Sequence, residues 1–140
     1  MLLNIDCMRD ILQYLVENLS VQYDAYPPVV EFKPIYLSTI CKNMIMYDDN
    51  DIAYALYNLN SAGYIETSIN PQYTRIEDFY IWNVSYEGQQ FYQNIHKSSV
   101  WERTKQVANK AGSVAISILS SIAQSIIMQE IAGLIAQQAP

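Results

Sequence analysis

The last thirty residues carry almost no charge, and this constrains the chain more than any other feature of its sequence. After Lys110 the only charged side chain is Glu130, and residues 111–129 are all uncharged. Serines recur here every four residues, with aliphatic residues beside them at the same spacing, a pattern that predicts a helix. A helix with this much aliphatic surface needs something to cover it in water.

We expect self-association of the chain, as a homo-oligomer, to provide that cover. Small residues four apart let two helices approach closely. The candidate oligomerisation residues are Val114, Ser117, Ile118, Ser121, Ile122, Ser125 and Ile126. Packing of the helix on its own domain is the alternative. Contact with a membrane is disfavoured, because the serine and glutamine side chains weaken insertion.

The rest of the chain has the composition of a globular domain. All 17 aromatic residues lie at or before Trp101, and 51% of the 140 residues are hydrophobic. This content excludes disorder as the main state, and the length is too short for two ordinary domains. We therefore predict a winged-helix-like domain at 1–96 and a helical extension at 97–140.

The order of the expected elements gives the fold class. The hydrophobic spacing predicts three helices, then two strands, then a helix that begins after Ser85 and a last helical run from Val100 into the tail. The pattern breaks over 20–34, where 29–32 fits a short edge strand. The fold class is thus mainly α with a small β-hairpin, a winged helix-turn-helix core and a long C-terminal helix. Helices are expected at 5–19, at 35–46 and around Ile52, Ala55, Leu56 and Leu59, and strands at 64–69 and 79–84.

Four short motifs occur in a fixed order and carry a family resemblance. They are Arg9-Asp10-Ile11-Leu12, Ala62-Gly63-Tyr64-Ile65, Ser85-Tyr86-Glu87-Gly88-x-x-Phe91-x-x-x-Ile95 and Val100-Trp101-x-x-Thr104-Lys105. Together they resemble domain-of-unknown-function family 2513, short proteins found largely in phages, prophages and bacterial genomes. The resemblance implies a winged-helix-like core with a trailing helix, and it implies no activity.

Binding to DNA is possible for such a fold, but the charges disfavour it. The net charge is −6, and Asp48, Asp49 and Asp51 crowd the start of the third expected helix, where they would repel phosphates. The same aspartates have a simpler role as helix caps. The candidate nucleic-acid residues are Arg75, Lys97, Arg103, Lys105 and Lys110, although a solvated helix face explains most of them equally well.

The aromatic residues suggest a surface for a protein partner, because tyrosine and tryptophan are enriched at interfaces. The alternative is that many of them complete a core that contains few Leu and Phe residues. The partner-binding candidates are Tyr54, Tyr57, Asn58, Tyr80 and Trp82.

Signals for catalysis are poor. His96 is the only histidine, so neither a Ser-His-Asp triad nor a site with several histidine ligands can be built. Cys7 and Cys41 form no CxxC pair, and we expect no cofactor and no metal. The first residues lack the pattern of a secretory signal, which favours the cytoplasm. We expect a non-enzymatic phage-type accessory protein that acts through an unknown protein partner; a winged-helix DNA-binding regulator and a membrane-associated effector are the alternatives.

Overall fold

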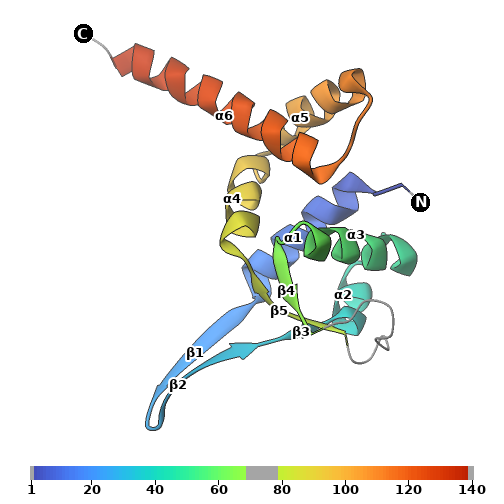
Figure 1. Cartoon of the computed structure of the whole chain (residues 1–140), viewed down its shortest axis with the longest axis vertical. Coiled ribbons are helices and arrows are strands. Elements are labelled where there is room, and N and C mark those ends of the chain that lie inside the picture. Colours follow the sequence, from blue (N-terminus) through green and yellow to red (C-terminus); the bar gives the residue numbers. More distant parts are fainter. Residues whose placement is uncertain (1, 69–78, 139–140) are drawn as a thin grey trace. The chain divides into compact units, whose positions relative to one another are not determined.

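The computed structural model describes residues 2–68 and 79–138 (Figure 1). The chain forms two compact units, unit 1 at Met1–Gln89 and unit 2 at Gln90–Pro140. The boundary falls inside helix α4 (Tyr86–Ile95). The described residues form six helices with short antiparallel strands and end in a long C-terminal helix, so the mainly α fold class is confirmed.

Helix α1 (Ile5–Asn18) packs against helix α3 (Asp49–Ser61) to form the core of unit 1. The side chain of Asn4 caps α1 by accepting a hydrogen bond from the backbone N–H of Cys7 at 3.0 Å. The predicted inward stripe of α3 is confirmed, since all four of its members are buried. The buried residues of the two helices are Cys7, Met8, Ile11, Leu12 and Leu15 in α1 and Ile52, Ala55, Leu56 and Leu59 in α3.

The predicted helix at 35–46 is wrong at both ends. Its first two residues form strand β3 (Ile35–Tyr36), which pairs with β5 (Tyr80–Val84), and helix α2 covers only Leu37–Asn43. Ile45, which falls inside the predicted helix, is exposed. The first two residues pair with β5 in the sheet and are therefore extended. The end of the segment leaves the helix so that Asp48 can cap α3.

Strand β4 (Ile65–Thr67) completes a three-stranded antiparallel sheet in the order β3-β5-β4. Ile65 lies opposite Val84, and both side chains are buried. Gly63, with φ +77°, turns the chain from α3 into β4. The described parts of the two predicted strands thus pair as expected.

The segment 20–34 contains a second hairpin, where only a short edge strand was predicted. Strands β1 (Ser20–Ala25) and β2 (Pro28–Lys33) pair antiparallel along their whole length. Within unit 1 this ribbon reaches away from the helices (Figure 1). Pro27 lies in the turn and Pro28 begins β2, and at both positions the missing backbone N–H is tolerated.

The start of α4 lies against the beginning of β4. Ser85 is its cap, as predicted: its Oγ accepts a hydrogen bond from the Gly88 N–H at 3.1 Å and donates one to the Gly63 carbonyl at 2.6 Å. A Cβ on Gly88 would lie 2.1 Å from the carbonyl oxygen of Tyr64. The close approach of α4 to β4 therefore requires glycine here.

Unit 2 contains helices α5 (Ser98–Ala111) and α6 (Ile116–Gln138). The prediction of one continuous helix from Val100 into the tail is wrong, because α5 ends at Gly112 with φ +75° and α6 begins four residues later. The two helices pack together. Their buried side chains are Val100, Trp101, Thr104 and Ala108 in α5 and Leu119, Ala123 and Ile126 in α6.

Candidate functional site

Two of the predicted partner-binding residues, Tyr80 and Trp82, lie together in a shallow groove of unit 1. Three residues that the sequence did not single out, Phe32, Pro34 and Tyr36, form the rest of its lining. Tyr36 lies opposite Tyr80 in the β3–β5 ladder. We call this the aromatic groove.

The rings of the aromatic groove hold each other in edge-to-face pairs. The centroids of Phe32 and Trp82 are 5.2 Å apart with an interplanar angle of 72°, and those of Tyr36 and Tyr80 are 5.6 Å apart at 60°. This is the arrangement that aromatic quadrupoles favour. The groove is thus lined by rings of fixed orientation, and none of its described lining residues carries a charge.

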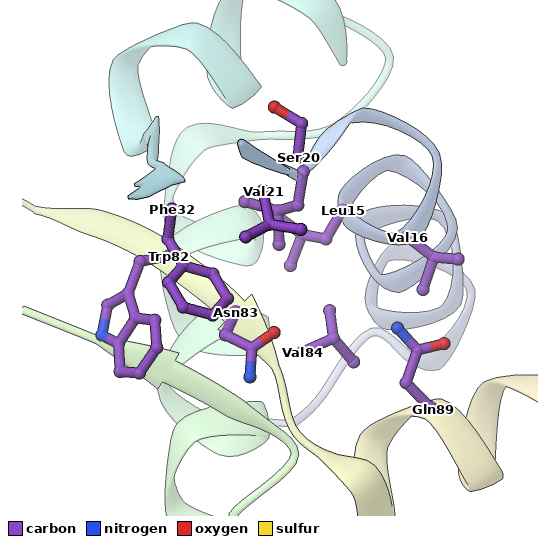
Figure 2. A pocket seen from close by; sticks show the side chains of 10 residues that line it. Leu15, Val16, Ser20, Val21, Phe32, Trp82, Asn83, Val84 and Gln89 are labelled. Carbon is purple, nitrogen blue, oxygen red and sulfur yellow. The ribbon is translucent and has the colours of Figure 1, made fainter. Parts of the chain in front are cut away.

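A second hollow lies on the other side of the Phe32–Trp82 pair, where the base of the β1–β2 ribbon meets α1 and the first turn of α4 (Figure 2). Its walls combine aliphatic, aromatic and polar side chains, among them the amides of Asn83 and Gln89. It is lined by Leu15, Val16, Leu19, Ser20, Val21, Phe32, Trp82, Asn83, Val84 and Gln89. The aromatic pair therefore separates two hollows of one surface.

The β1–β2 ribbon continues this surface with an apolar face. Val21 lies opposite Phe32 and Tyr23 opposite Val30, so all four side chains project from the same side. Their exposed fractions are 57% for Val21, 41% for Phe32, 67% for Tyr23 and 59% for Val30. The alternation of apolar and polar residues on both sides of the Pro27-Pro28 pair was the signal that could have identified this hairpin from sequence.

The structure places the other partner-binding candidates on α3, where they line neither hollow. The rings of Tyr54 and Tyr57 stack with centroids 6.3 Å apart and an interplanar angle of 7°. The Asn58 amide donates a hydrogen bond to the Tyr54 carbonyl at 2.8 Å. That amide group is thus bonded within its own helix.

The aspartates at the start of α3 behave as caps. The Asp48 carboxylate accepts a hydrogen bond from the backbone N–H of Asn50 at 2.7 Å, and Asp49 and Asp51 lie in the first turn, where the helix dipole favours negative charge. Unit 1 as a whole contains 4 Lys and Arg residues against 12 Asp and Glu residues, a net charge of −8. This field repels phosphates.

Most of the nucleic-acid candidates lie in unit 2, where they pair with acidic side chains. Lys97 and Arg103 lie 3.8 Å and 4.0 Å from the Glu130 carboxylate. Lys105 lies 3.1 Å from Glu102 and sits over the ring of Trp101. Lys110, in the last turn of α5, forms no ion pair with the residues that the structure describes, and Arg75 lies outside those residues.

The seven oligomerisation candidates do not share one environment. Ser117, Ile118, Ser121 and Ser125 are exposed on α6, and Ile122 is half-buried. Ile126 is buried in the α5–α6 packing, and Val114 lies in the link between the two helices. Packing on α5 therefore covers one stripe of α6, and the serine stripe lies outside that stripe.

The end of α6 has the largest uncovered apolar surface of unit 2. Every residue of 131–138 is exposed, including Ile131, Leu134 and Ile135 at 42%, 58% and 66%. These turns follow Glu130, whose carboxylate forms ion pairs with Lys97 and Arg103 near the start of α5. By length and composition, α6 is also the one helix among the described residues that could cross a membrane.

The two cysteines are free thiols with suppressed acidity. Burial, reinforced by the charges of Asp51 and Asp10, raises the pKa of Cys7 to about 12. Burial and then the neighbouring Asp49 raise the pKa of Cys41 to about 11. Burial and a hydrogen bond to Asp10 also raise the pKa of Tyr47. No metal-ligand cluster occurs among residues 2–68 and 79–138.

These pKa values predict slow thiol chemistry and a loss of stability at high pH. At pH 8 both thiols are almost wholly protonated, so labelling by a disulfide reagent should be roughly tenfold or more slower than for a free thiol of pKa about 8.5. The pKa values of the two thiols in the folded chain exceed the ordinary value of 9.0. The stability that the protonated thiols contribute is therefore present below pH 9 and is lost as the pH rises through 11. Labelling rates and denaturation midpoints between pH 7 and 11 check this; equal labelling of native protein and free thiol would contradict it.

Comparison with known protein families gives a match over most of the chain. The family model described as "Hypothetical protein (DUF2513)" matches residues 2–114. No curated protein and no solved structure matches the chain. The matched region contains all of unit 1 from residue 2 onward and α5, and it ends just before α6 begins at Ile116.

Proposed function

The chain belongs to the DUF2513 family, and we propose that it is a non-enzymatic, cytoplasmic accessory protein of the phage or prophage type that acts through protein–protein contacts. In this proposal the aromatic groove of unit 1 binds a protein partner, and α6 joins copies of the chain. The observation that carries the proposal is the uncovered apolar end of α6, in a protein that must remain dispersed in water.

The winged-helix interpretation is part of the proposal, and the topology of unit 1 supports it. Leaving aside the β1–β2 ribbon, the elements follow the order α1-β3-α2-α3-β4-β5, with β3 paired to β5 and β4 at the other side. In this arrangement α2 and α3 are the helix-turn-helix pair and β4 and β5 flank the wing. Fold alone does not assign the use of such a domain.

The exposed apolar side chains near the end of α6 support self-association. The side chains of Ile131, Leu134 and Ile135 lie within two turns and none of them is covered by α5. A second copy that presents the same turns would bury both apolar surfaces at once, as an isologous interface does. Burial of this kind stabilises association by about 25 cal/mol per Å² of apolar area, before the cost of association is subtracted.

We expect the double substitution Leu134→Lys with Ile135→Lys to convert the assembly to a monomer. Both positions are exposed, so lysine fits the helix there without disturbing the α5–α6 packing. The matched control, Ala132→Lys with Ala136→Lys, adds the same charge to exposed positions of the same turns on another side of the helix and should keep the assembly. Light scattering measures the masses, and a variant that keeps the wild-type mass would overturn the role of these turns.

A membrane-associated effector is the second candidate, and the length and apolar character of α6 favour it. It predicts that the full chain floats with lipid vesicles. Self-association predicts that the chain stays with the protein fraction. Three of the four basic residues of unit 2 pair with carboxylates, and this leaves little free positive charge to attract anionic lipid.

A winged-helix DNA-binding regulator is supported by the topology and opposed by the charges. The acidic start of α3 and the pairing of Lys97, Arg103 and Lys105 with carboxylates leave little positive surface. Binding to duplex DNA at low salt that weakens after Arg103→Ala and Lys105→Ala would favour this alternative.

A further inference from the structure

We infer that the aromatic groove binds a proline-rich segment of a partner protein, with basic residues beside the prolines. This inference rests on the proposed role in protein binding, and it is independent of self-association through α6. The juxtaposition that carries it is Phe32, Tyr36, Tyr80 and Trp82 around Pro34, inside a unit of net charge −8.

The lining of the groove selects the kind of segment. Aromatic rings held edge to face, two tyrosine hydroxyls and one indole N–H offer apolar surfaces together with hydrogen-bond donors. A polyproline II segment has the complementary surface: prolyl rings that stack on aromatic faces, and carbonyl groups without internal partners that accept hydrogen bonds. Its conformation is formed before binding, so little entropy is lost.

The fixed orientation of the rings makes the groove ready for such a ligand. Phe32 and Trp82 hold each other edge to face at 5.2 Å, and Tyr36 and Tyr80 do so at 5.6 Å. Tyr36 and Tyr80 are also tied by direct pairing of β3 with β5. Rings that are already held lose little rotamer freedom when a ligand docks.

The charge of unit 1 selects basic flanking residues. The described lining of the groove is uncharged, and the opposite face of the β1–β2 ribbon carries the half-buried Asp24 and the exposed Glu31 and Lys33. With 12 acidic residues against 4 basic ones, unit 1 attracts Lys and Arg and repels acidic segments. A second copy of unit 1 carries the same negative charge and is therefore a poor occupant of the groove.

Fluorescence anisotropy with the full chain tests this inference. The probe is a labelled synthetic peptide with a run of prolines flanked by arginines; the comparison probes replace the arginines with glutamates, or the prolines with glycine and serine. We expect the proline–arginine probe to bind and both comparison probes to bind about tenfold more weakly or not at all.

Two variants locate the binding. Tyr36→Ala should weaken the binding of the proline–arginine probe about tenfold, and Trp82→Phe should weaken it less, because the ring remains and the indole N–H is lost. Tyr86→Ala is the control, an exposed tyrosine at the start of α4 that lines neither hollow, and it should leave binding unchanged.

Three results would overturn the inference: no binding of the proline–arginine probe, equal binding of the glycine–serine probe, or equal effects of Tyr36→Ala and Tyr86→Ala. Sedimentation of the same samples separates this from self-association. If Tyr36→Ala dissociates the assembly, the groove holds a second copy and the inference is wrong. If the assembly persists but the proline–arginine probe does not bind, the inference about the groove is wrong and self-association through α6 is unaffected.

Discussion

Replacing Gly88 with alanine is expected to lower the free energy of unfolding by about 2–3 kcal/mol, the upper part of the range for overpacked sites. The added Cβ would lie 2.1 Å from the carbonyl oxygen of Tyr64 and 2.8 Å from Cγ1 of Val84. The first contact is with backbone, which cannot rotate away, so α4 must move from the start of β4. That movement also strains the hydrogen bond that Gly88 donates to Ser85.

Gly133→Ala is the matched control for this substitution. Gly133 is also inside a helix, and nothing lies within 4 Å of the position that its Cβ would take. Alanine there should leave stability unchanged or raise it by roughly 0.5–1 kcal/mol, the ordinary gain of alanine over glycine in a helix. Urea denaturation of the full chain compares the two variants; equal stabilities would show that the Gly88 contact is not a constraint.

Truncating Trp101 to alanine is expected to cost about 3–5 kcal/mol in unit 2, the usual cost of removing a large buried aromatic side chain. Trp101 is 1% exposed and is the largest of the fully buried side chains. Its loss would also remove the ring over which Lys105 lies. Because α5 and α6 form a small unit with few buried side chains, no other group can replace this contribution.

Hydrogen exchange along α5 and α6 measures this cost directly. A loss of this size should speed the exchange of the best-protected amides by roughly two to four orders of magnitude. Val107→Ala, on an exposed position of the same helix, should change exchange less than about tenfold. Similar exchange in the two variants would contradict the assignment of Trp101 to the core of unit 2.

Helices with a strong hydrophobic period could be predicted from the sequence. The spacing of Ile52, Ala55, Leu56 and Leu59 gave the buried face of α3, and Ser85 gave the start of α4. Segments whose structure depends on distant partners could not be predicted. Ile35 and Tyr36 continue a helical pattern locally, but their pairing with Ile81 and Tyr80 makes them a strand.

The aromatic groove shows the same limit. Tyr80 and Trp82 could be named from composition, but Phe32 and Tyr36 belong to segments that were predicted to be a short edge strand and a helix. Only the strand pairing brings the four rings together. On α6, serine periodicity drew attention to the serine stripe, whereas the exposed surface is largest at residues 131–138, beyond the pairing with α5.

The mass of the full chain in solution tests the central proposal most directly. Sedimentation over a series of concentrations should give an assembly larger than the 16.1 kDa single chain, and Leu134→Lys with Ile135→Lys should return it to that mass. A wild-type chain that sediments at 16.1 kDa at every concentration would contradict self-association through α6.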